Sequence, residues 1–309
     1  WGRVGGDCMN DLQQYQSEHL FLLVGTNPLP NYVAVKLLLR PSGHIYLVYT
    51  DETAVVADRL IAVLEQKQEM GQVTKILVKE AESGNIFEQV TNHAKGKNGI
   101  GLNYTGGTKT MAVHAYRAIE QTCPDAVFSY LDAWTLSLFV EPAARKFYVA
   151  DKCSVSLSEL LALHGYSLPP IRQSPNHPDP CKALAKVHSD PVAYSQWRSW
   201  LEQRSPQDLP DPNRYPALQE VTKVLRQMGQ TIPEIAQALN PKWKSLEECR
   251  KWLLGEWLEE YALWACLEAK SPNHPNLFGD HGIDLRPQNP QGRTFQFDIA
   301  LIRGYQLFA

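Results

Sequence analysis

The sequence predicts an α/β protein that begins with a mostly parallel sheet covered by helices on both faces. Short apolar runs alternate with segments of helical spacing from Phe21 to Asp151, which is the pattern of βαβ units. Two alternating segments joined by Pro-Ala-Ala-Arg then predict a closing hairpin. The chain has 309 residues, of which 44% are hydrophobic and 20% are charged, so we expect more than one globular domain.

Each element of this first domain follows from its own run of residues. Apolar stretches of strand length are bounded by turn-forming residues, and the segments between them place apolar side chains at helical spacing. The expected strands are residues 21–25, 44–50, 73–79, 100–105, 126–132, 136–141 and 146–151. The expected helices are residues 33–39, 53–67, 85–93 and 107–121. Residues 1–20 show little periodicity and stay unassigned, which leaves 21–151 as the first domain.

Residues 152–240 form the second predicted part, a linker and helical connector. A short helix with Ser156 or Ser158 as its cap comes first, and the proline-rich residues 167–180 then break every periodic pattern. Broken helices follow, and the last two have the length of a helix-turn-helix unit. We favour a packed connector over a DNA reader, because no basic recognition face is evident. Its expected core residues are Trp197, Trp200, Leu201, Val224 and Leu225.

Residues 241–309 form the third predicted part. One long helix is expected from about Ser245 to Ala269, and its many large apolar side chains predict burial on most sides. Gly255 in its middle predicts close packing or a nearby backbone. A strand over residues 294–302 follows a polar loop and holds Asp298 near its middle, and another strand begins just before the last residue.

A glycine-rich turn joins the expected strand at 100–105 to the next helix. Backbone N–H groups at such a turn point beyond the sheet edge, and the helix dipole and a lysine add positive charge. This favours a phosphate-binding loop over the alternative, a tight turn with a solvated lysine. The spacing fits neither a Walker A loop nor a dinucleotide-binding G-x-G-x-x-G fingerprint. The residues of the loop are Asn103, Thr105, Gly106, Gly107, Thr108 and Lys109.

A second polar turn follows the first expected strand. Thr26, Asn27 and Pro28 come directly after it, and Asn31 lies close behind. Taken alone, this is equally well an ordinary proline-stiffened turn with a helix cap. Ligands of parallel sheets bind beyond the carboxyl ends of the strands, where two neighbouring loops part. Together with the glycine-rich loop, the turn therefore predicts one joint pocket.

Two carboxylates in the third part point to a different chemistry. Glu259 lies on the long helix, and Asp298 lies in the strand that follows. A carboxylate buried in a strand and facing a glutamate from a helix can hold a divalent metal for phosphodiester cleavage. The alternative is that Asp298 ends a strand face in solvent and that Glu259 is one more charge on a helix. Spacing alone does not decide between the two.

Charge and cysteine content restrict the surroundings in which this protein works. The net charge of −3 lacks the basic surplus of proteins that grip long duplex DNA, so any nucleic acid is short or held by a local patch. The six cysteines form no C-x-x-C pair, which suits a reducing cytoplasm. No apolar run approaches the length of a membrane span, and no signal-peptide pattern opens the chain. We therefore expect a cytoplasmic protein.

These motifs resemble two known families. VGTNPLPNY after the first strand and NYTGGTKTM after the fourth are similar to the CARF domain, the Rossmann-like, CRISPR-associated sensor of cyclic oligoadenylates. The helix GEWLEEY and the strand FQFDIALI resemble the restriction-endonuclease-like PD-(D/E)xK domain that is fused to CARF in one CRISPR effector family. Asp298 matches the catalytic aspartate of that strand. The family's third element, an acidic residue and a lysine, would fall just beyond Ala309, so the nuclease domain is expected to be incomplete.

The resemblance implies a nuclease of type III CRISPR antiviral defence that a cyclic oligoadenylate activates, with cyclic tetra-adenylate as the expected ring. Two CARF domains would pair as a homodimer whose two-fold axis matches the symmetry of that ring. Lys109 and the amides of residues 106–108 would hold phosphates, and Asn27, Asn103 and Thr105 would bond ribose or adenine. Glu259 and Asp298 would hold Mg²⁺ or Mn²⁺ for cleavage of DNA, RNA or both.

Two alternatives stay open at this point. One is a non-catalytic regulator that senses the ring and acts through the helical connector on a partner or an operator. The other is a ring nuclease, in which the CARF pocket itself cleaves the messenger. The first predicts tight ligand binding without cleavage under any metal, and the second predicts products from the ligand alone.

Overall fold

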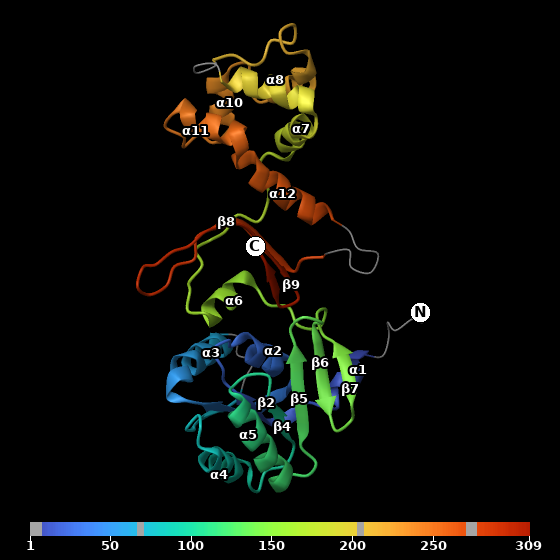
Figure 1. The fold of residues 1–309 in the computed structure, drawn as a ribbon, viewed down its shortest axis with the longest axis vertical. Helices are drawn as coiled ribbons and strands as arrows, with labels where there is room; N and C mark the ends of the chain where they lie inside the picture. The colour runs from blue at the N-terminus through green and yellow to red at the C-terminus, as the bar shows by residue number, and fades with distance from the viewer. Residues whose placement is uncertain (1–7, 67–70, 203–206, 270–276) are drawn as a thin grey trace.

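The computed structural model describes residues 8–66, 71–202, 207–269 and 277–309, which stack as three tiers along one axis (Figure 1). A large sheet with its helices forms the first tier, a small sheet with one short helix the middle tier, and a group of helices the third. The large sheet is mostly parallel, so the predicted α/β class is confirmed. In these ranges, no helix has both the length and the apolar character needed to cross a membrane.

The first tier contains every strand and helix expected between residues 21 and 151, with shifted ends. Its strands are β1 (Ser17–Leu23), β2 (Leu39–Tyr49), β3 (Val73–Leu77), β4 (Ile100–Asn103), β5 (Val127–Asp132), β6 (Ser137–Glu141) and β7 (Arg145–Tyr148). Its helices are α1 (Cys8–Gln13), α2 (Leu29–Leu38), the 3₁₀ turn η1 (Asp51–Thr53), α3 (Ala54–Gln66), α4 (Ser83–Ala94) and α5 (Lys109–Thr122). β1 begins inside the segment that the sequence left unassigned.

The large sheet has the strand order β3-β2-β1-β4-β5-β6-β7. Strands β1 to β5 pair in parallel, whereas β6 and β7 are antiparallel and form the predicted hairpin. Leu20 and Leu22 of β1 pack on the side of α2 and α3, and Phe21 and Leu23 pack on the side of α4 and α5. A strand covered on both faces must be apolar throughout, which explains the uninterrupted run in β1.

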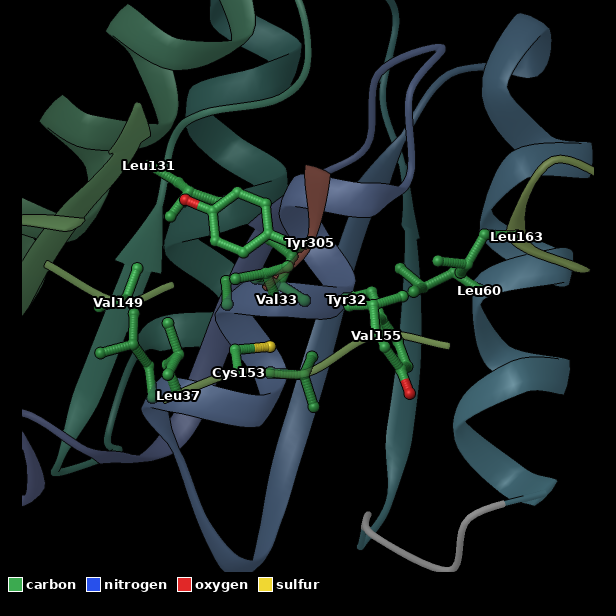
Figure 2. Close-up of a cluster of buried hydrophobic side chains, with 14 of the residues drawn as sticks. Tyr32, Val33, Leu37, Leu60, Leu131, Val149, Cys153, Val155, Leu163 and Tyr305 are labelled. Carbon is green, nitrogen blue, oxygen red and sulfur yellow. The ribbon is translucent and has the colours of Figure 1, made fainter. Parts of the chain in front are cut away.

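The core on the α2 side includes a residue from the far end of the chain. Figure 2 shows Tyr305 among side chains of this core, including Val33 of α2, and Tyr305 is 2% exposed. Gly304 next to it has a φ of 60°, and a Cβ there would lie 2.7 Å from the carbonyl oxygen of Ala150. The Val155 amide donates to the Gly304 carbonyl (3.0 Å). The middle tier is therefore fastened to the core of the first.

The middle tier combines α6 (Leu157–Leu163) with an antiparallel sheet in the order β10-β9-β8. Its strands are β8 (Asp280–Leu285), β9 (Phe297–Arg303) and β10 (Gln306–Phe308). Ser156 caps α6, as one of the two predicted candidates, and its hydroxyl accepts from the Glu159 amide (3.1 Å). The proline-rich segment lies along this sheet, because the Ile283 amide donates to the Arg172 carbonyl (3.0 Å). The predicted linker is thus held in place by β8.

The third tier is the predicted group of packed helices. Trp197, Trp200, Leu201 and Leu225 are each at most 2% exposed, and Val224 is partly buried against them, so the predicted connector core is confirmed. The elements are α7 (Pro178–Ser189), α8 (Pro191–Leu201), the 3₁₀ turn η2 (Pro216–Leu218), α9 (Gln219–Arg226), α10 (Ile232–Leu239) and α11 (Leu246–Lys251).

The expected long helix is divided into three pieces. A π-helical turn, η3 (Trp252–Glu256), separates α11 from α12 (Trp257–Glu268), which runs down to the middle tier (Figure 1). A Cβ built on Gly255 meets no atom within 4 Å, so the predicted close packing at this glycine is wrong. Leu254 and Leu258 are 49% and 54% exposed, so the helix is also not buried on most sides. The wider π turn changes which side chains face the core, and a regular helical pattern does not anticipate that.

Trp197→Ala should destabilise the third tier, because the side chain is 1% exposed and its removal leaves a cavity. Truncation of a buried aromatic residue costs about 3–5 kcal/mol, which urea unfolding followed by circular dichroism measures. Val192→Ala on the same helix is the matched control, since Val192 is 61% exposed. The control should stay within about 0.5 kcal/mol of the wild type. Equal unfolding midpoints for the two variants would contradict the role given to Trp197.

Candidate functional site

The first candidate site lies where β1 and β4 end side by side. The chain leaves β1 towards β2 on one side and β4 towards β5 on the other, so the two loops part here. Open parallel sheets bind their ligands at such a switch point. Helices α2 and α5 begin in these loops, at Leu29 and Lys109, and both N-termini add partial positive charge. The two loops singled out in the sequence are therefore neighbours.

The loops touch through glycines. A Cβ on Gly106 would collide with the carbonyl oxygen of Leu23, and a Cβ on Gly25 would lie 3.0 Å from the amide nitrogen of Gly107. Gly107 also has a φ of 72°, in the left-handed region that favours glycine. Close approach and backbone conformation together leave no room for side chains here. The backbone of the loop is thus presented directly to anything bound above it.

Two predicted site residues brace these loops from below. Asn103 is fully buried, and its side chain donates to the Ser129 hydroxyl (3.0 Å) and accepts from the Thr105 amide (3.3 Å). Asn31 is equally buried and donates to the Leu23 carbonyl (2.9 Å). For Asn103, a direct contact with a ligand would require the side chain to leave these partners, whereas the buried side-chain oxygen of Asn31 has no hydrogen-bond partner. In this structure both side chains position the loops.

Two threonines fix the ends of the glycine-rich loop. The Thr105 hydroxyl accepts from the Leu131 amide (2.8 Å), and the Thr108 hydroxyl accepts from the Met111 amide (3.2 Å) and so caps α5. Each hydroxyl keeps its own proton for donation. Both residues are half-buried, so a ligand above the loop can accept these protons.

The remaining predicted residues of this site differ in exposure. Thr26, Asn27 and Lys109 are exposed, whereas Pro28 is buried at the start of α2. The side-chain oxygen of Asn27 accepts from the Leu29 amide (3.1 Å), which leaves its NH₂ group for other partners. Lys109 forms no ion pair with any residue that the structure describes. Its charge is therefore free to meet an anion.

The second candidate site is a cavity of about 510 Å³ where α12, β8 and the proline-rich segment meet. Glu259 and Glu260 reach its wall from α12, Asp284 from β8, and Arg172 from the proline-rich segment. Trp243 adds an aromatic surface to the wall. The cavity thus combines carboxylates, a guanidinium and an aromatic ring, which suits a charged ligand.

Glu259 carries the perturbed carboxyl group of this cavity. Burial raises the pKa of Glu259, the carboxylates of Asp298, Asp284 and Glu256 raise it further, and Arg172 opposes them. A raised pKa means that the folded, metal-free protein disfavours the charged form. The contribution of Glu259 to stability is accordingly present at low pH and lost as the pH rises through that pKa.

Asp298 lies near Glu259 but is not buried. It is the second residue of β9, is exposed, and accepts from the side-chain amide of Gln296 (3.3 Å). The predicted position of Asp298 near the middle of the strand is wrong, because β9 begins only at Phe297. Of the two alternatives that the sequence leaves open for Asp298, the solvent-exposed carboxylate is the one observed. Asp284 lies opposite Asp298, between the pairs formed by residues 283 and 299 and residues 285 and 297. The carboxylates of Asp284 and Asp298 thus lie side by side on one face of this sheet.

The donor set suits a hard divalent cation without forming a finished site. Carboxylate oxygens are ligands that Mg²⁺ and Mn²⁺ prefer, and the mutual repulsion around Glu259 would be relieved by such an ion. No group of three or more His, Cys, Asp or Glu side chains in the described ranges is arranged to hold a metal. Glu259 and Asp298 can contribute ligands, and further ligands have to come from water, substrate or other residues.

Glu260 and Arg172 form the residue pair that the sequence did not reveal. The Glu260 carboxylate accepts from Arg172 Nη1 (2.7 Å) and from the amides of Asn176 and His177 (2.8 Å each). Its side chain is 7% exposed, so Glu260 is fully engaged, unlike its neighbour Glu259. No motif around residue 172 indicates this, since the segment is marked only by its prolines. The pair exists because the tertiary structure brings that segment against α12.

An apolar surface adjoins the first site on α5 and β5. Val113 and Tyr130 are 54% and 41% exposed, and Tyr104 and Tyr116 line a hollow of about 360 Å³ with Val113. Tyr104 and Tyr116 both donate to the Glu141 carboxylate (3.2 Å each), which fixes their rings. Exposed apolar surface of this kind marks an interaction site when it is contiguous.

The fold and the first site together define a Rossmann-like ligand-binding class, with a glycine-rich loop at the switch point of a mostly parallel sheet. Residues 20–159 match the family model of the Card1 CARF domain. The first tier is therefore a CARF domain, in agreement with the resemblance of its two loop motifs. No curated protein matches the chain in sequence.

Solved structures extend the likeness to nearly the whole chain. Can2 from Sulfobacillus thermosulfidooxidans, solved with cyclic tetra-adenylate, has a TM-score of 0.67 and 15% identity, over 97% of this chain and 80% of that one. VC1899 from Vibrio cholerae has a TM-score of 0.62 and 13% identity, over 94% and 78%. A type III CRISPR defence DNA nuclease activated by cyclic oligoadenylate has a TM-score of 0.52 and 18% identity, over 93% and 38%. At such identities the likeness shows the fold alone.

Gly106→Ala should damage the first tier, because the new methyl group meets the Leu23 carbonyl and the loop has to move. Overpacking of this kind costs about 1–3 kcal/mol of unfolding free energy, which chemical denaturation measures. Gly84→Ala is the matched control, since a Cβ on Gly84 meets no atom within 4 Å and the residue lies in α4. That variant should be neutral or stabilised by up to about 1 kcal/mol. An undisturbed Gly106→Ala protein would show that the loops do not touch.

Proposed function

We propose that this protein senses a cyclic oligoadenylate, with cyclic tetra-adenylate as the expected ring, and responds by metal-dependent cleavage of DNA, RNA or both in type III CRISPR defence. The observation that carries the proposal is the pair of touching loops at Gly25 and Gly106 inside a CARF domain. Can2, which shares the overall fold, was solved with cyclic tetra-adenylate. The type III DNA nuclease of similar fold is activated by cyclic oligoadenylate.

Lys109 and the backbone amides of Gly106, Gly107 and Thr108 are the proposed phosphate ligands. They lie at the N-terminus of α5, where the helix dipole and the lysine charge act in the same direction. The loop of Thr26, Asn27 and Pro28 forms the opposite side, with Asn27 and Thr105 as the polar groups for ribose or adenine. Asn31 and Asn103 hold the two loops in register from below.

A homodimer of CARF domains would complete the ligand site. The ring of cyclic tetra-adenylate has two-fold symmetry, so two copies of the loops can present the same contacts to its two halves. The apolar surface around Val113 and Tyr130 adjoins the loops and suits the contact between the two copies. Each copy would then contribute one Lys109 to the shared ligand.

Helix α2 offers a physical route from the first site to the rest of the molecule. It begins at the ligand loop, and its Tyr32 hydroxyl donates to Glu159 of α6 (3.0 Å). Lys36 Nζ on the same helix donates to the Ser154 carbonyl (3.2 Å). Ligand binding can act on the middle tier only if the ring binds more tightly to the active arrangement of the molecule. Helix α2 can transmit this preference, because it contacts both the ligand loop and the middle tier.

The proposed cleavage site is the cavity of Glu259. Glu259 and Asp298 would hold Mg²⁺ or Mn²⁺, and a bound ion of this kind supplies activation of water and stabilisation of the leaving oxygen. Burial is the largest cause of the raised pKa of Glu259, and a bound cation would relieve the carboxylate repulsion that adds to it. Metal binding would therefore strengthen as the pH rises through that pKa. The rival proposal is a non-catalytic sensor, which binds the ring and cleaves no nucleic acid with any metal.

Lys109→Ala should weaken binding of cyclic tetra-adenylate by about tenfold or more, because a charge-assisted hydrogen bond to phosphate is lost. Isothermal titration calorimetry of both proteins against the ring measures this. Lys95→Ala is the matched control. Lys95 is exposed at the end of α4, just before β4 begins, and so lies at the end of the strands opposite to the ligand loops. Equal affinity of the Lys109→Ala variant and the wild type would remove Lys109 from the ligand site.

Asp298→Asn and Glu259→Gln should each lower metal-dependent cleavage of plasmid or RNA by about a hundredfold or more, if the carboxylates hold the ion. Cleavage is followed on gels with cyclic tetra-adenylate and Mg²⁺ or Mn²⁺ present. Asp179→Asn on α7 is a control with the same charge change at an exposed ion pair. Cleavage by the wild type that persists undiminished in both variants would place the active centre elsewhere. Tight ring binding without cleavage by the wild type would favour the non-catalytic sensor.

A further inference from the structure

The cavity of Glu259 repels nucleic acid unless a cation offsets its carboxylates. Glu256, Glu259 and Asp284 line it, and a nucleic-acid backbone carries one negative charge at each phosphate. Two arginines reach the same wall, Arg172 and Arg286. Arg286 is exposed and already paired with Asp284, through Nε and Oδ1 at 3.0 Å. Arg172 is therefore the cation to consider.

Arg172 is held at both its backbone and its side chain. Its carbonyl accepts from the Ile283 amide (3.0 Å), which attaches the proline-rich segment to β8 as an additional edge. Its Nη1 donates to the Glu260 carboxylate at 2.7 Å, and its side chain is 34% exposed. A long side chain fixed at both ends loses little further freedom when it binds a ligand.

Glu260 is suited to holding this arginine in one orientation. Its carboxylate is buried and also accepts from the amides of Asn176 and His177, just before α7. With three donors on two oxygens it has no room to turn. A guanidinium has five N–H donors, and within the described residues only Nη1 of Arg172 is hydrogen-bonded. Arg172 lines the cavity and is partly exposed, so its remaining donors are available to a ligand there.

We infer that Arg172 binds a phosphate of the nucleic-acid substrate beside Glu259 and that Glu260 is the residue that positions it. The planar guanidinium can donate two hydrogen bonds to one phosphate while a third holds Glu260. The phosphate is thereby brought next to the carboxylates that would otherwise repel it. This inference rests on the proposed nuclease function and adds a substrate-binding residue that lies outside the resembling motifs.

Salt dependence of substrate binding tests the inference without relying on cleavage. The full chain with cyclic tetra-adenylate is titrated with a fluorescent single-stranded DNA or RNA of one sequence, with Ca²⁺ in place of Mg²⁺, and anisotropy is followed at several salt concentrations. Loss of one phosphate contact lowers the slope of log K against log salt by about 0.7. We expect Arg172→Gln to show this loss together with a Kd raised about tenfold.

Three further variants make the result specific. Arg198→Gln removes the same charge from an exposed ion pair on α8 and should leave both the slope and the Kd unchanged. Arg172→Lys keeps the charge and should keep the slope. Its Kd should rise less than that of Arg172→Gln, because a lysine cannot donate the paired hydrogen bonds of a guanidinium to one phosphate. Glu260→Gln leaves Arg172 in place but removes the carboxylate that fixes its orientation. The Kd should therefore rise about two- to tenfold with the slope retained.

The outcomes separate this inference from the function on which it rests. A wild-type protein that binds neither oligonucleotide overturns the nuclease proposal and the inference with it. Binding by the wild type with an unchanged slope for Arg172→Gln overturns the inference alone, and a lowered melting temperature would then show a purely structural ion pair. If Arg172→Gln does not fold, Arg172→Lys takes its place in the test. A slope of log K against log salt that is lower by about 0.7 in Arg172→Lys would then overturn the inference, because the lysine keeps the charge.

Discussion

The first tier depends on one close approach, that of the Leu23 carbonyl to Gly106. No side chain fits between them, so the loop after β4 can lie directly against the end of β1. That contact brings together the N-termini of α2 and α5 and leaves the amides of the glycine loop uncovered. Asn31 and Asn103 then serve this geometry from the buried side, each bonded within the sheet. The chemistry of the site is thus carried mainly by backbone, with Lys109 as its full charge.

The same contact links the proposed ligand site to the remainder of the molecule. Helix α2 begins in the loop after this contact, so a shift of the loop would act on it. Its Tyr32 is bonded to Glu159 of α6, and its Lys36 to the Ser154 carbonyl just before α6. Tyr305 adds a second connection, since it fills the core beneath α2 and belongs to the turn between β9 and β10. A signal from the proposed ligand site would therefore need no separate hinge. The core of the sensor is shared with the domain that it would control.

Helix α12 shows how two adjacent glutamates acquire opposite roles. Glu260 is buried with three donors, and its charge is satisfied. Glu259 faces the cavity among other carboxylates, and burial and repulsion raise its pKa. Neighbouring positions on a helix point about 100° apart, so a single turn can place one carboxylate in a structural network and the next in a site. Both residues are glutamates, so the amino-acid type alone does not distinguish their roles.

The sequence by itself determined the α/β class, the order of elements in the first tier, the packed aromatic core of the third and the two polar loops of the CARF domain. These features are local, since strand and helix periodicity, turn residues and glycine spacing are written in consecutive residues. Only the tertiary structure decided that Asn103 is buried, that Asp298 is exposed, that Gly255 lies in an open π turn and that Arg172 meets Glu260. Each of these depends on which distant segment packs against the residue, and burial and charge pairing across such contacts leave no trace in the local pattern.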